Sequence, residues 1–307
     1  MSADKIGRND PCPTSQMDFA SMEEMQAFLN TFQSQRNQSP VDDFRGLSPN
    51  QMHALLHFPL ESPDVVRVST VLDSEPDAPL AYLFGLLAEV IGDEGLKPTA
   101  KGNLPRNACR EIMQAFLGES GYAKRTRFGG INAEHDAAEL HFTRIVAELA
   151  GFVRKYRGRF ILSRAARGML AATGQRELYP QLFRTYTTQF NWAYRGGIVE
   201  MPAIIQQGWA FTAYLLHLEG HQPQPATFYA DAFRQAFPMV DMDLEEGPLL
   251  YRSLEDTWRR VYTLDCLEHF AAFTGIATVR KVDDDVMTPP QATSVQATPL
   301  LSRLIQF

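Results

Sequence analysis

The sequence predicts a mainly α-helical protein, built from helical bundles that are joined by short β-hairpins. Apolar residues recur every three or four positions along 80–91 and 258–273, which is the spacing of a buried helical face. Two short apolar runs meet at Arg157-Gly158, and this pattern predicts a two-stranded hairpin with a tight turn. A third region, 179–238, is rich in aromatic residues whose spacing indicates helices that pack around a core.

The length of 307 residues suits one large domain or two to three small ones. We expect a first segment, 1–40, that holds a short helix at 22–32 and a polar linker. A second segment, 41–175, should be a helical domain that carries the basic hairpin. The third, 176–307, should be the aromatic-rich helical domain, with a hairpin-like unit near its C-terminal end. Within it, Trp192 and Tyr194 are expected in the core, and a surface for stacking bases is the alternative.

The stretch 132–170 shows how the hairpin is framed by helices. Asn132 is expected to cap a helix that continues to about Leu149, since its side chain can accept from free N–H groups of the first turn. The hairpin follows, and Ser163 should cap the next helix. This order resembles the end of a winged-helix domain, in which the hairpin is the wing.

Two further stretches share this pattern of helix, glycine, short strand and helix. They begin near residues 95 and 275, and in the second of them Thr298-Pro299 is expected to open a last helix that reaches Phe307. The uneven spacing of 95, 151 and 275 does not fit a solenoid. Repeated winged-helix-like units would explain the pattern, and so would chance.

Charge is distributed unevenly along a chain whose net charge is −7. Residues 95–168 contain 14 Lys and Arg against 6 Asp and Glu, a net charge of +8, so the rest of the chain carries −15. Residues 151–168 contain six basic residues and no acidic one. Such a patch fits the phosphates of nucleic acid or another polyanion. The alternative is a solvated hairpin whose charges keep its edge strand from pairing with a neighbour.

The predicted nucleic-acid-binding residues are the cations of this hairpin and of the segment before it, namely Arg154, Lys155, Arg157, Arg159, Arg164, Lys124, Arg125 and Arg127.

The N-terminal residues Gly7 to Pro13, GRNDPCP, match the opening of the SEC-C motif. This small zinc-binding module occurs at the tail of the bacterial preprotein translocase ATPase and in many bacterial proteins of unassigned function, which the whole chain resembles. Thr14 stands where the module has its second cysteine, and no closing ligand pair follows. A structural zinc site needs four ligands, so the motif is degenerate, and we expect no metal or other cofactor.

A weaker constellation involves Glu134, His135, Glu139 and His141. Carboxylate–histidine pairs can hold a metal or transfer protons, so a metal-dependent hydrolase that uses His135 and His141 is one alternative function. On an exposed helix such pairs are more often ordinary surface charge, which is the expectation here.

The remaining features bound the class of protein. Cysteines occur at 12, 109 and 266 alone, which fits a reducing compartment and provides no disulfide framework. The polar N-terminus and the short apolar helices predict a cytoplasmic protein without membrane contact. The first hypothesis is therefore a non-enzymatic binding or regulatory protein whose partner is nucleic acid or an acidic protein. A structural scaffold is a further alternative, and the oligomeric state is left open.

Overall fold

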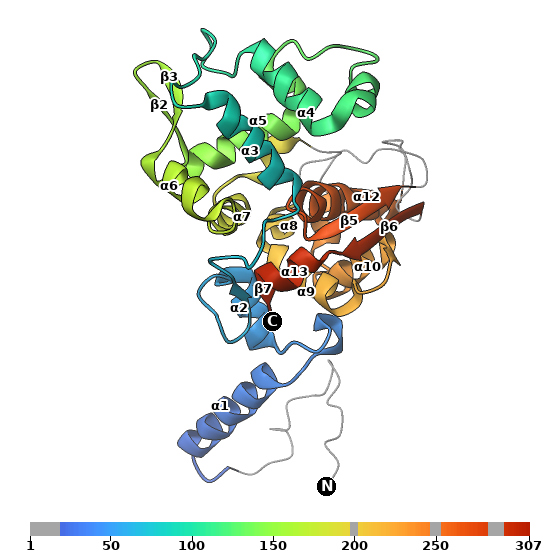
Figure 1. Cartoon of the computed structure of the whole chain (residues 1–307). Coiled ribbons are helices and arrows are strands. Elements are labelled where there is room, and N and C mark those ends of the chain that lie inside the picture. The colour runs from blue at the N-terminus through green and yellow to red at the C-terminus, as the bar shows by residue number, and fades with distance from the viewer. Residues whose placement is uncertain (1–18, 197–201, 246–252, 282–291) are drawn as a thin grey trace. The chain divides into compact units, whose positions relative to one another are not determined.

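The computed structural model describes residues 19–196, 202–245, 253–281 and 292–307 (Figure 1). Most of these residues are helical and the strands are short and antiparallel, so the mainly α class is confirmed. The chain forms two compact units, Met1–Gln51 and Met52–Phe307. The expected division after residue 175 falls inside the second unit. The SEC-C-like residues 7–14 lie outside the described residues.

The first unit contains helix α1 (Met22–Gln38), which Ser21 caps by accepting from the backbone N–H of Glu24. A short 3₁₀ turn, η2 (Asp42–Phe44), follows. The next helix, α2 (Pro49–His57), runs across the boundary between the units. Proline at its first position removes a backbone N–H that would have no partner there.

In the second unit, strand β1 (Arg67–Val68) follows α2, and two groups of elements come after it in succession. The first group consists of α3 (Pro79–Ile91), α4 (Arg106–Arg125, broken at Gly118), the 3₁₀ turn η3 (Glu134–Asp136), α5 (Ala138–Leu149), β2 (Val153–Tyr156), β3 (Arg159–Leu162) and α6 (Arg164–Thr173). Figure 1 shows its helices gathered around α3 and α5, with the β2–β3 hairpin at one side.

Three further elements, α7 (Leu178–Thr188), η4 (Trp192–Arg195) and α8 (Ala203–Gln207), lead to the second group. The second group consists of α9 (Trp209–Glu219), β4 (Gln224–Pro225), α10 (Ala226–Ala236), α11 (Val240–Glu245), α12 (Leu254–Tyr262) with its π-helical continuation η5 (Thr263–Ala272), β5 (Ala277–Lys281), β6 (Thr293–Ala297) and α13 (Pro299–Leu304).

The two groups have the same strand topology. In the first, Leu96 lies between α3 and α4 and pairs antiparallel with Phe160 of β3, whose other neighbour is β2. In the second, β4 lies between α9 and α10 and pairs with β6, whose other neighbour is β5. In both, a piece of extended chain between two helices pairs with the second strand of a later hairpin.

The base of each hairpin is closed by an equivalent hydrogen bond. Ser163 N–H donates to the Phe152 carbonyl at 2.8 Å, and Thr298 N–H donates to the Ile276 carbonyl at 3.0 Å. Each acceptor directly follows a glycine with positive φ, where a side chain would be strained. Each donor directly precedes a helix, α6 or α13. The equivalence therefore extends from the strands to the turns that flank them.

This arrangement revises the expected repeat. The patterns beginning near 95 and 151 belong to one group, because Leu96 and β3 form a single small sheet. The pattern beginning near 275 belongs to the other. The structure thus contains two groups of like topology rather than three separate units.

Several element boundaries differ from prediction. Helix α1 continues to Gln38, across residues 33–38 that were expected to form part of a polar linker. The helix expected to start after Asn132 starts at Ala138 instead. The Asp136 carboxylate accepts from the backbone N–H groups of Asn132 and Ala133, which stabilises the short turn η3 in place of a first helical turn. The last helix ends at Leu304, because the chain becomes strand β7 (Ile305–Gln306) and pairs with β1.

The aromatic-rich region forms a core, as predicted. Trp192, Trp258, Tyr179 and Tyr186 are buried. Their polar atoms are paired inside the protein: the Trp258 indole N–H donates to the Ala230 carbonyl at 2.7 Å, and the Trp192 indole to the Tyr186 carbonyl at 2.9 Å. Buried aromatic residues with satisfied polar atoms add both apolar area and fixed geometry. Trp192 is therefore a core residue and is not available to stack bases. Tyr194, which was also expected in the core, is instead 57% exposed.

Within the described part of the chain, no helix combines the length and the apolar character that crossing a bilayer requires.

Candidate functional site

The β2–β3 hairpin is specified by the two residues of its turn. Arg157 and Gly158 both have positive φ, +47° and +73°, as a two-residue hairpin turn requires. The register pairs Arg154 with Ile161, Lys155 with Phe160, and Tyr156 with Arg159. Because side chains alternate between the faces of a strand, Phe160 points to the core while Arg154, Tyr156 and Arg159 share the outer face.

The hairpin cations are exposed and close together in sequence and space. Arg154, Lys155, Arg157 and Arg159 are all exposed, and so is Arg164 at the start of α6. The guanidinium groups of Arg154 and Arg157 lie 5.9 Å and 5.2 Å from the centre of the Tyr156 ring.

The other three predicted cations lie elsewhere. Lys124 and Arg125 end α4, and Arg127 follows in the next turn. The Arg125 guanidinium donates to the carbonyl of Asp136 at 2.8 Å, which ties this segment to η3. Figure 1 shows α4 on a different side of the group from the β2–β3 hairpin. The structure therefore divides the eight predicted residues between two surfaces.

The loop 95–104 adds cations that the sequence analysis did not assign to the site. Leu96 exchanges two backbone hydrogen bonds with Phe160, and the Arg159 guanidinium donates to the Gly95 carbonyl at 2.9 Å. The Lys155 amine lies over Gly102, so close that a Cβ there would be 3.1 Å from it. Lys97 and Lys101, both exposed, are thereby held alongside the hairpin.

We call the set of Arg154, Lys155, Arg157, Arg159, Lys97 and Lys101 the basic hairpin surface. Two exposed carboxylates adjoin it in the chain: Asp93, which is 3.6 Å from Arg167 of α6, and Glu94, which directly precedes Gly95. This surface is assembled by contacts between residues about sixty positions apart. No local pattern in the sequence predicts these contacts.

A second polar cluster is centred on Glu134. Its side chain is fully buried, and one carboxylate oxygen lies 2.8 Å from His141 Nδ1 and 2.5 Å from Arg144 Nε. The other oxygen accepts from the backbone N–H of Leu104 at 2.5 Å. Burial acts to raise the pKa of Glu134, but the hydrogen bonds and the Arg144 charge outweigh it and hold the pKa below its ordinary value.

This cluster corrects the expectation that Glu134 and His141 are surface charges. Arg144 is also buried, and it makes a further ion pair with Glu148 at 2.7 Å. The second ring nitrogen of His141 lies 3.0 Å from the Tyr194 hydroxyl, so the network joins η3, α5 and η4. A set of paired, hydrogen-bonded charges in this position fixes how the three elements meet.

The residues of the hydrolase alternative are not brought together in this way. His135 is 76% exposed in its side chain and lies 3.5 Å from Asp136, whereas His141 is held by Glu134 and Tyr194. Among the described residues, no group of three His, Cys, Asp or Glu side chains is placed to hold a metal ion. Burial raises the pKa of the Cys109 thiol to about 12, so this cysteine is protonated at neutral pH.

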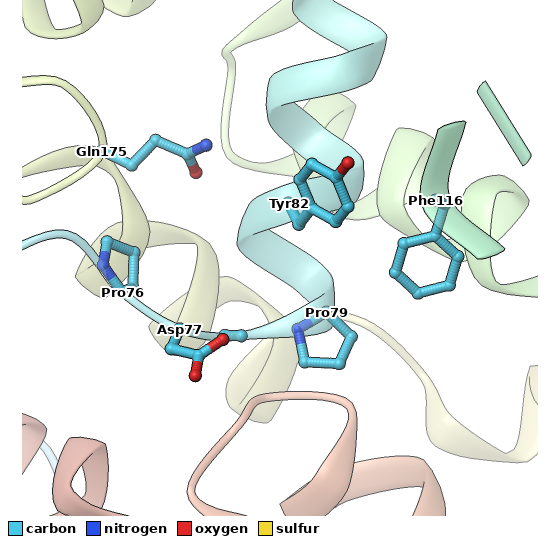
Figure 2. Close-up of a pocket in the computed structure, with 7 residues that line it drawn as sticks. Pro76, Asp77, Pro79, Tyr82, Phe116 and Gln175 are labelled. Atoms are coloured by element: carbon cyan, nitrogen blue, oxygen red, sulfur yellow. The ribbon is translucent and has the colours of Figure 1, made fainter. Parts of the chain in front are cut away.

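The N-terminal end of α3 borders a surface groove of about 340 Å³ (Figure 2). Tyr82 and Phe116 lie side by side there, with ring centres 5.9 Å apart, and Gln175 and Asp77 supply the polar groups. The residues that line this groove include a carboxylate and no Lys or Arg, so the groove does not suit a polyanion.

Comparisons with known proteins give no guide to the role of either cluster: no family model, curated protein or solved structure matches the chain.

Proposed function

We propose that the protein binds nucleic acid and that the basic hairpin surface contacts its phosphate groups. The single observation that carries this proposal is the concentration of exposed cations on β2, β3 and loop 95–104. Lys and Arg side chains that face phosphates release condensed counterions, and this release supplies most of the affinity in sequence-independent binding.

The topology supports the same proposal. We infer that the two groups of elements are winged-helix-like units, since each has a piece of extended chain between its first two helices, a later hairpin that pairs with it, and a closing helix. By this comparison β2–β3 is the wing of the first group of elements. A wing that carries four exposed cations is suited to contact a phosphate backbone.

The competing explanation is that these charges only protect an edge strand. β2 pairs with β3 and forms the outer strand of the small sheet, so charged residues there would also discourage pairing with another chain. Binding measurements separate the two explanations, because edge protection requires no affinity for a polyanion.

The test is fluorescence anisotropy of labelled single-stranded DNA, RNA and duplex DNA across a salt series. We expect binding whose logarithm falls linearly with the logarithm of the salt concentration. In the variant Arg154→Ala/Lys155→Ala/Arg157→Ala/Arg159→Ala, the salt slope should decrease by about 0.7 for each lost contact to a single strand. Absence of binding to all three ligands at low salt would overturn the proposal.

A matched control uses the other cation group. The variant Lys124→Ala/Arg125→Ala/Arg127→Ala removes nearly as much charge from the end of α4. We expect its salt slope to stay close to that of the wild type. If this variant lost as much affinity as the hairpin variant, general charge rather than the basic hairpin surface would be responsible.

A further inference from the structure

Tyr156 is an exposed aromatic residue in the middle of the basic hairpin surface. It is 51% exposed, and β-sheet register places it on the same outer face as Arg154 and directly opposite Arg159. The Arg154 and Arg157 guanidinium groups lie within 6 Å of the ring centre, at 5.9 Å and 5.2 Å. An accessible ring surrounded by cations combines the two features that bind an unpaired base and its flanking phosphates.

The position of α5 argues against recognition of a duplex groove. In helix-turn-helix proteins the recognition helix enters the major groove with an exposed face. Here α5 packs against α3, α4 and α7, and Tyr194 of η4 covers His141. Leu149, at the C-terminal end, is the one exposed residue of α5, and the helix also carries the acidic residues Glu139 and Glu148. The first group of elements thus offers its hairpin to a ligand, while its third helix, α5, is packed in the core.

We propose that the preferred ligand is single-stranded nucleic acid, with one unpaired base stacked on Tyr156 and its neighbouring phosphates bound by Arg154 and Arg157. This inference rests on the proposed function and specifies its ligand. In a duplex the faces of the bases are already stacked on one another, so the ring of Tyr156 would gain nothing from them. In a single strand every base has a free face, and stacking is tolerant of sequence.

The experiment compares two ligands of equal charge, labelled oligothymidylate and an oligomer of the same length made entirely of abasic sites. We expect the full-length wild type to bind oligothymidylate about five-fold or more tighter than the abasic oligomer, since a stacked base contributes on that scale. Tyr156→Leu should remove this preference and leave affinity for the abasic oligomer within about two-fold, because no phosphate contact is lost. Tyr156→Phe should retain the preference.

The control variant is Tyr82→Leu. Tyr82 is 50% exposed, which matches Tyr156, but it lies in the groove beside Phe116. Its replacement should leave both affinities unchanged. Thermal unfolding of each variant verifies that the fold is intact.

The outcomes separate the inference from the proposed function. Equal affinity for the two oligomers, with binding that the four-alanine hairpin variant abolishes, would overturn the stacking inference and leave the proposed function standing. A preference for bases that Tyr156→Leu does not change would also overturn it. If neither oligomer binds at low salt, both the inference and the proposed function fail.

Discussion

The substitution Glu134→Gln should destabilise the protein far more than the loss of one hydrogen bond suggests. The Glu134 carboxylate is fully buried and accepts from Leu104, His141 and Arg144. Glutamine has the same shape but carries no charge, and its amide group would direct two donors toward groups that are themselves donors. Of its two carboxylate partners, Arg144, whose side chain is 7% exposed, would then keep only Glu148.

The magnitude follows from the burial of both partners. Breaking a buried ion pair by removing one member costs about 3–5 kcal/mol, because the remaining charge is left uncompensated. Glu148 still neutralises part of the Arg144 charge, so we expect the lower end, about 3 kcal/mol. The matched control is Glu148→Gln, whose side chain is 29% exposed. With Glu134 intact, this change should cost about 1 kcal/mol or less.

Urea unfolding followed by tryptophan fluorescence and circular dichroism measures both free energies of unfolding. The double variant Glu134→Gln/Arg144→Met should lose less stability than the sum of the two single changes, since the second change removes the charge that the first leaves unpaired. If Glu134→Gln costs no more than Glu148→Gln, the buried ion pair of Glu134 and Arg144 does not stabilise the fold.

The same carboxylate predicts a pH dependence. Because the pKa of Glu134 is lowered in the folded state, its stabilisation is complete above the unfolded-state pKa of about 4.3 and is lost as the pH falls through the folded value. Acid titration of stability should therefore be steeper for the wild type than for Glu134→Gln, and equal slopes would contradict the assignment. A separate prediction concerns Gly95, where a Cβ would lie 2.7 Å from the Phe160 carbonyl. Gly95→Ala should lower the free energy of unfolding by about 1–3 kcal/mol more than Gly118→Ala, since both glycines have positive φ but Gly118 has open space around it. Chemical unfolding of the two variants measures this difference. Equal losses would show that loop 95–104 does not pack tightly on β3.

Local signals in the sequence were enough to predict the hairpin. Arg157-Gly158 forms its turn, and the Ser163 hydroxyl accepts from Ala166 N–H at 3.2 Å, as a helix cap should. Both features depend on residues within a few positions of one another. The mainly α class was predictable for the same reason, since helical periodicity is also local.

The contacts that assemble the candidate site were not predictable in this way. Leu96 pairs with Phe160, and His141 meets Tyr194, across long stretches of chain with no shared pattern. The sequence placed Glu134 and His141 in one carboxylate–histidine constellation, but their burial depends on how α4, α5 and η4 pack. Asn132 is not the predicted cap, because its side-chain oxygen accepts from Arg110 and its side-chain amide donates to the Gly130 carbonyl.

The hydrogen bond that closes each hairpin at its base allows the loop at the tip of the hairpin to vary in length. Ser163 to Phe152 and Thr298 to Ile276 fix the two ends of each hairpin before the strands reach their turn. The first hairpin needs only Arg157-Gly158 to reverse direction, whereas residues 282–292 join the strands of the second. Since loop closure costs little more as a loop lengthens, a base held in this way lets insertions accumulate at the tip without opening the sheet. Each hairpin is therefore a position at which new sequence can be added while the helices around it keep their packing.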